Sequence, residues 1–112
     1  MWIFTSESFI SVVADRDDPK KLLVRARVAG HIEALFPAAK VFQVEGSDYL
    51  HRALVPRKTV KQVVARHVES IGYDNFKNSV RDWELHESYM GVWRVMHDLQ
   101  NKLNLPPSQA GL

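Results

Sequence analysis

Residues 9–69 contain the same small pattern twice, a pair of short strands followed by a helix. The first copy reads FISVVAD, an acidic turn, LLVRARV and AGHIEALF, and the second reads KVFQVEG, a short turn, LHRALVPR and TVKQVVARHVESI. Segments rich in β-branched residues that are separated by Asp, Pro and Gly are typical of β-hairpins. Two such units in tandem predict an α+β fold built around one sheet.

The order of the segments restricts how the strands are arranged. Because connections are short, we expect the strands at 22–28 and 51–55 to lie side by side and parallel in the centre of a four-stranded sheet. The strands at 9–15 and 41–45 then pair on the outside, and residues 2–5 can extend one edge. With two helices on one face, this is a two-layer sandwich with a permuted ferredoxin-like sheet.

The helices and the domain limits follow from caps and periodicity. Thr59 is the expected N-cap of the second helix, and Asp74 that of a short third helix. An added C-terminal helix is expected at 85–103, where apolar residues alternate at spacings of four and three. We expect a single compact domain over 1–105 and a flexible tail over 106–112.

Composition excludes several classes of protein. The chain has no cysteine, which excludes a disulfide scaffold, thiol chemistry and cysteine-based zinc sites. Its first residues lack the basic region and long apolar run of a signal peptide, and no stretch reaches the roughly 18 apolar residues of a membrane span. We therefore expect a cytoplasmic protein that requires no membrane.

Positive charge is concentrated in the middle of the chain. Residues 19–67 carry ten lysines and arginines against three acidic residues, whereas the segments on both sides are acidic. The whole chain has a net charge of only +2. This asymmetry favours an anionic partner for the middle segment, either RNA or DNA or an acidic protein surface.

Five basic residues form the candidate binding site. Alternation with Val24 and Ala26 places Arg25 and Arg27 on the sheet face opposite the core, where they are exposed enough for alanine to leave folding nearly intact. Arg52 lies on the neighbouring strand, and two further cations lie near the start of the second helix. Guanidinium groups on a rigid sheet suit phosphate and carboxylate recognition. The predicted anion- or partner-binding residues are Arg25, Arg27, Arg52, Arg57 and Lys58.

Alternatives to this site remain open. If it is not a binding site, the face that carries the arginines is either a solvated surface or a surface that the last helix covers. The two central strands carry no aromatic residue, so a domain that stacks RNA bases on those strands is a poor match. The apolar stripe at 85–103 also permits packing against a partner helix. That helix would belong to a second copy of the chain, to another protein, or to a target that this chain inhibits.

The histidines of the sequence do not have the spacing that a catalytic or metal site needs. His86 and His97 are about 16 Å apart along one helix, too far to share an ion. His67 lies on the predicted buried stripe of its helix and reads as a core residue. A ribonuclease-like pairing of His51 with Arg52, or of His86 with Glu87, is the enzymatic alternative. We therefore expect a non-enzymatic binding module with no catalytic residue, metal or cofactor.

Five segments stand in the order WIFTSESFISVV, DDPKKLLVRARV, DYLHRALVPRKTV, IGYDNFKNSV and YMGVW. This order resembles a family of short uncharacterised bacterial proteins over about residues 2–95, and LLVRAR and YDNFK are its most distinctive pieces. The family has no established activity, so the resemblance implies one compact cytoplasmic domain and assigns no site residue. A small inhibitor or interaction protein, including one of mobile-element origin, fits it equally well.

Overall fold

The computed structural model describes residues 1–104, so the tail expected at 106–112 lies outside the described residues. The chain forms two compact units, Met1–Asp74 and a second that begins at Asn75. The expectation of a single domain over 1–105 stays a prediction. Among the described residues, no helix combines the length and apolar character needed to cross a bilayer.

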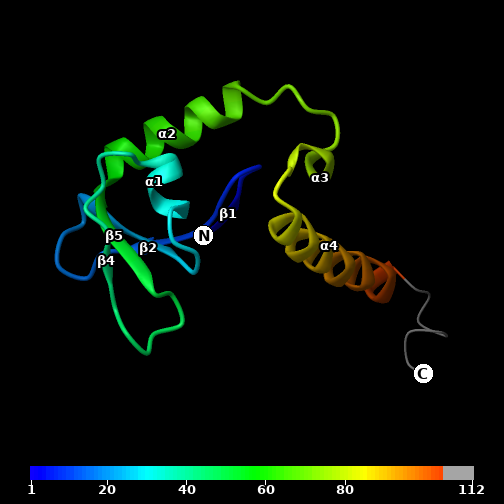
Figure 1. The fold of residues 1–112 in the computed structure, drawn as a ribbon, viewed down its shortest axis with the longest axis horizontal. Coiled ribbons are helices and arrows are strands. Elements are labelled where there is room, and N and C mark those ends of the chain that lie inside the picture. Colours follow the sequence, from blue (N-terminus) through cyan, green and yellow to red (C-terminus); the bar gives the residue numbers. More distant parts are fainter. Residues whose placement is uncertain (105–112) are drawn as a thin grey trace. The chain divides into compact units, whose positions relative to one another are not determined.

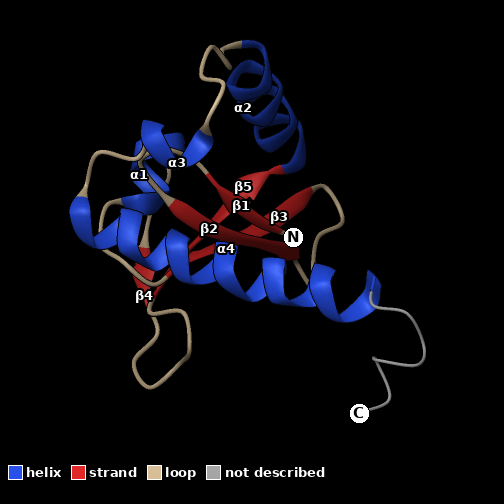
Figure 2. Cartoon of the chain, turned by 90° about the vertical axis from the view of Figure 1, so that its right-hand side faces the viewer, coloured by secondary structure: helices blue, strands red, loops and turns tan. Residues whose placement is uncertain are grey.

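All five strands belong to the first unit and form one sheet, drawn red in Figure 2. The strands are β1 (Trp2–Phe4), β2 (Phe9–Ala14), β3 (Lys21–Ala26), β4 (Phe42–Gln43) and β5 (His51–Pro56). Their order across the sheet is β1-β2-β3-β5-β4, and every neighbouring pair is antiparallel. The α+β class and the edge strand at the N-terminus are confirmed.

The predicted neighbours β3 and β5 do lie side by side, but their predicted parallel direction is wrong. A parallel pair needs a crossover that returns the chain along the full strand. The intervening helix α1 (His31–Leu35) has five residues, about 7.5 Å, whereas β3 is about 20 Å long. The chain instead reverses in the loop at 44–50 and runs back along β3. The predicted parallel crossover from β3 to β5 is therefore wrong. Helix α1 instead connects β3 to β4, which run parallel to each other because both are antiparallel to β5, the strand between them.

The helices α1 and α2 (Arg57–Glu69) cover the same face of the sheet, as Figure 1 shows. Alternate residues of β2, β3 and β5 point toward them. The buried cluster consists of Ile10, Val12, Val24, Ala26, Ile32, Leu35, Phe36, Ala53, Val55, Val60 and Val63. We call this the core face. The opposite face carries the other set of alternating residues.

Helix α2 begins earlier than predicted. It starts at Arg57, directly after Pro56, and not at a Thr59 cap. The backbone N–H of Arg57 donates to the carbonyl of Lys20 at 2.7 Å, so a neighbouring turn satisfies a group that a cap would otherwise serve. The second half of α2 is more exposed than its apolar stripe predicted. His67 is exposed and not a core residue, and Val68 is 62% exposed.

The second unit contains α3 (Phe76–Ser79) and α4 (Trp83–Asn104). The side chain of Asn75, and not that of Asp74, accepts the capping hydrogen bond of α3 from the backbone N–H of Asn78. Tyr89 of α4 is buried and stacks on Phe76 of α3, with ring centroids 5.7 Å apart. The predicted long C-terminal helix is confirmed and is two residues longer at its N-terminal end.

Candidate anion-binding face

Strand register places one row of residues straight across the sheet. Ser11 of β2 lies opposite Arg25 of β3, and Arg25 lies opposite Arg52 of β5. Directly opposed residues of antiparallel strands point to the same side. Their neighbours Val12, Val24 and Ala53 belong to the core, so Ser11, Arg25 and Arg52 point away from it. We call this surface, together with Arg27 and Tyr49, the arginine face.

Tyr49 contacts all three arginines of this face. The guanidinium carbons of Arg25 and Arg27 each lie 4.4 Å from the centroid of its ring. Nε of Arg52 donates to the backbone carbonyl of Tyr49 at 3.1 Å. The negative face of an aromatic ring attracts cations, so the ring offsets part of the repulsion between Arg25 and Arg27. An aromatic side chain thus compensates part of the positive charge of this face.

Tyr49 is 3% exposed, and polar side chains lie near its hydroxyl. Burial acts to raise the pKa of this hydroxyl. Hydrogen bonds with Arg27, Ser11 and Trp2 and the positive charge of Arg27 outweigh burial and lower the pKa below its ordinary value of 10.0. The groups that lower this pKa come from β1, β2 and the residue after β3.

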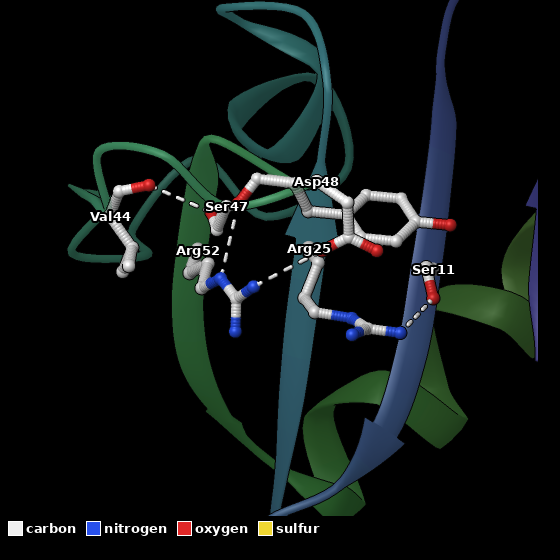
Figure 3. Close-up of polar contacts among 7 residues, drawn as sticks. Ser11, Arg25, Val44, Ser47, Asp48 and Arg52 are labelled. Carbon is white, nitrogen blue, oxygen red and sulfur yellow. Dashed lines mark hydrogen bonds and ion pairs between the residues drawn. The ribbon is translucent and has the colours of Figure 1, made fainter.

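The loop between β4 and β5 holds Tyr49 in place. The Ser47 hydroxyl lies 2.7 Å from the carbonyl oxygens of both Val44 and Tyr49, and the N–H of Val44 donates to Leu50 at 2.9 Å. Gly46 has a φ of 77°, a conformation that residues with a Cβ rarely adopt. Figure 3 shows Ser47 directed toward Val44 at the start of the loop. A constrained loop therefore presents the tyrosine to the arginines.

Two of the arginines also have partners of their own. Arg25 donates from Nη2 to the Ser11 hydroxyl at 2.9 Å, and Arg52 lies 3.6 Å from the Asp48 carboxylate (Figure 3). Asp48 is 67% exposed, so water screens this ion pair. Arg27 is exposed, and its guanidinium group lies against Tyr49. One carboxylate against three guanidinium groups leaves the face positively charged.

Exposed aromatic residues lie at both ends of the cross-strand row. Trp2 of β1 is opposite Ser11 and is 65% exposed, and Phe42 of β4 is opposite Arg52 and is 46% exposed. The sequence correctly predicted no aromatic residue on β3 or β5. It missed Trp2, Phe42 and Tyr49 because they come from edge strands and a loop. The alternation of Trp2 and Phe4 with Ile3 was the only local signal that could have placed Trp2 on this face.

The remaining two predicted site residues lie elsewhere. Arg57 and Lys58 begin α2, beyond Pro56, which is paired with Lys21 at the far end of the sheet. Pro56 is four residues along β5 from Arg52, about 13 Å. Nε of Arg57 donates to the Pro19 carbonyl at 3.1 Å. The structure therefore brings together Arg25, Arg27 and Arg52 but not Arg57 and Lys58.

The residues of the enzymatic alternative are arranged differently from the arginine face. His51 is 8% exposed and points to the core face, opposite to Arg52, so those two side chains do not meet. Nδ1 of His86 lies 3.7 Å from the Glu87 carboxylate, and the His86 ring stacks on Trp83. Residues 1–104 contain no group of three or more metal-ligating side chains close enough to hold an ion.

Comparison with protein-family models, with curated proteins and with solved structures finds no match for this chain.

Proposed function

We propose that the protein is a non-enzymatic binding module that recognises an anionic partner through the arginine face. One observation carries this proposal: a single buried residue, Tyr49, contacts the three guanidinium groups of Arg25, Arg27 and Arg52. The Tyr49 ring and Asp48 offset only part of the repulsion among these three cations, so a partner that supplies negative charge would stabilise the face further. Guanidinium forks bind phosphate and carboxylate oxygens in pairs, so the chemistry suits a polyanion.

Nucleic acid is the partner class that we favour over an acidic protein surface. The arginines are flanked by the exposed rings of Trp2 and Phe42, and aromatic rings between cations are typical of nucleic-acid binding surfaces. Phosphate contacts release counterions, so affinity must fall as salt rises. Three phosphate contacts on a single strand predict a loss of about 20-fold between roughly 50 and 200 mM salt.

The test is a binding titration with three labelled polyanions: single-stranded RNA, duplex DNA and poly-glutamate. We expect Arg27→Gln to weaken binding and to lower the salt slope by about one unit. Arg94→Gln on α4 makes the same change in charge at another exposed position and should leave binding unchanged. Equal losses in both variants, or no binding by any polyanion at low salt, would overturn the proposal. Binding by poly-glutamate alone would identify an acidic protein as the partner.

A second candidate function, binding of another protein or a second copy, rests on α4. Val92, Met96 and Leu99 follow the spacing of four and three and are 43%, 55% and 42% exposed. Such a stripe suits a partner helix. Sedimentation of the full chain tests self-association. A dimer that Met96→Glu dissociates, and Arg94→Glu leaves intact, would support this function, whereas a monomer at all concentrations would exclude self-association.

The enzymatic alternative is tested in the same incubations. Labelled RNA that remains intact after prolonged incubation with the protein supports a binding module. Cleavage that His86→Ala abolishes would establish a ribonuclease and would replace the proposed function.

A further inference from the structure

Trp2 is exposed and yet held in a defined orientation. Its ring is nearly perpendicular to that of Phe9, at 81° with ring centroids 6.0 Å apart, and its indole is close enough to the Tyr49 hydroxyl to help lower the pKa of that group. These contacts fix the indole from two directions, while 65% of the residue stays accessible. An exposed tryptophan with no binding role gains little from being fixed, because its apolar surface stays in water. A fixed and accessible indole is instead a ready stacking surface.

The fixed indole lies near a solvent-exposed cation, Arg27. The guanidinium carbon of Arg27 lies 4.4 Å from the centroid of the Tyr49 ring, and both Arg27 and Trp2 help to lower the pKa of the Tyr49 hydroxyl, so both side chains lie beside this one residue. Arg27 is exposed, unlike the half-buried Arg25. An aromatic plane next to an accessible guanidinium group matches the two parts of a nucleotide, a flat base and a phosphate.

A second aromatic ring extends this arrangement across the sheet. Phe42 stands at the other end of the cross-strand row, four strand spacings from Trp2, or about 19 Å. Arg25 and Arg52 lie between the two rings. An extended strand of nucleotides that crosses the sheet would meet a ring, cations and a second ring in turn.

We propose that the arginine face binds single-stranded nucleic acid, with a base stacked on Trp2 and an adjacent phosphate bound by Arg27. This inference rests on the proposed function and specifies its ligand. A duplex presents phosphates but keeps its bases stacked inside, so it can engage Arg27 and not Trp2. A single strand has unstacked bases and can engage both.

The test compares single and double strands on matched variants. The probes are a labelled single-stranded oligonucleotide of about ten nucleotides and the duplex of the same length. We expect the single strand to bind more tightly and Trp2→Leu to weaken it about 5- to 150-fold, with little effect on the duplex. Trp83→Leu is the control, since Trp83 is similarly exposed, at 71%, and lies on α4.

A second measurement does not depend on how well Trp2→Leu folds. The chain contains three tryptophans, so the double substitution Trp83→Phe with Trp93→Phe leaves Trp2 as its only indole. Stacking of a base on Trp2 should quench the fluorescence of this variant when the single strand is added. The duplex should quench it much less at equal saturation.

The outcomes separate this inference from the function on which it rests. The stacking inference would be overturned by equal affinity for the single strand and the duplex, by unchanged binding in Trp2→Leu, or by Trp2 fluorescence that the single strand does not quench. Any of these results would leave a polyanion-binding face. Absence of binding to any polyanion would overturn both. Selective single-strand binding that depends on Trp2 and Arg27 but not on Trp83 would support both.

Discussion

Arg25 and Ser11 face each other across β3 and β2, and Nη2 of Arg25 donates to the Ser11 hydroxyl at 2.9 Å. Ser11 is 1% exposed, and Nε of Arg25 is buried without a hydrogen-bond partner among the described residues. Arg25 is therefore part of the packing of the sheet as well as a charge on its surface. We now expect Arg25→Ala to reduce stability, in contrast to the expectation from alternation alone. Arg27 is the better residue for testing ligand binding.

Removal of the Ser11 hydroxyl should destabilise the fold. Ser11→Ala leaves the buried end of Arg25 without its acceptor and takes one hydrogen bond from Tyr49. We expect a loss of about 1 to 3 kcal/mol in the free energy of unfolding, measured by urea denaturation. Ser88→Ala removes an exposed hydroxyl that only bonds back to the Glu84 carbonyl, and should change stability by less than about 0.5 kcal/mol. Equal effects of the two substitutions would show that the Ser11 hydrogen bonds contribute nothing specific.

The ring and the hydroxyl of Tyr49 should make separable contributions. Tyr49→Phe keeps the ring beneath Arg25 and Arg27 and removes only the hydroxyl, so we expect a loss of about 1 kcal/mol. Tyr49→Ala also removes a buried ring and should lose about 3 kcal/mol or more. Urea denaturation of both variants measures the difference. If alanine is no worse than phenylalanine, the ring does not hold the arginines.

Alkaline titration should distinguish two tyrosines. Contacts with Arg27 lower the pKa of Tyr49, whereas burial raises the pKa of Tyr89. Between the folded-state pKa of Tyr49 and 10.0, the unfolded chain binds more protons at this residue, so Tyr49 adds stability as pH rises. Above 10.0, the folded chain retains the Tyr89 proton longer, so Tyr89 reduces stability as pH rises further.

Ultraviolet difference spectra check this order of ionisation. Tyr49→Phe should remove an early step and Tyr89→Phe the last one. Loss of the last step in Tyr49→Phe would contradict the assignment.

Two glycine-to-alanine substitutions should change the stability of the fold in opposite directions. Gly46 has a φ of 77°, so a Cβ there is strained although nothing lies within 4 Å. We expect Gly46→Ala to destabilise by about 1 to 2 kcal/mol and to weaken polyanion binding, because its loop positions Tyr49. Gly91 lies inside α4 with open space around its Cβ position, so Gly91→Ala should stabilise by about 1 kcal/mol. Thermal denaturation measures both; a stabilising Gly46→Ala would mean that this turn relaxes freely.

Neutralising Asp48 should strengthen binding to a polyanion. Asp48→Asn releases Arg52 from its only ion pair among the described residues, and makes the salt slope steeper by about one unit. Stability should change by less than about 1 kcal/mol, because the pair is exposed. Glu45→Gln in the same loop changes the net charge equally and serves as the control. Salt-dependent titrations of both variants make the comparison, and equal slopes would show that Arg52 does not reach the ligand.

Local patterns were enough to predict the elements and the faces of the strands. Alternation put Arg25 and Arg27 on the side away from the core, and it did so because the side-chain period of a strand is two whatever its partner. Turn residues and apolar spacing likewise located the hairpins and α4. These properties depend on residues close in sequence, and most of them are confirmed.

The tertiary structure alone decided the direction of β5, the partners of the arginines and the composition of the face. Direction depends on how far α1 carries the chain, and the nearness of Trp2, Arg27 and Tyr49 depends on contacts between residues 22 to 47 positions apart. Such contacts arise from the register of several strands at once, which no local pattern encodes. The sequence by itself determined that arginines line one side of a sheet; packing decided that a tyrosine joins them and that an exposed indole lies beside them.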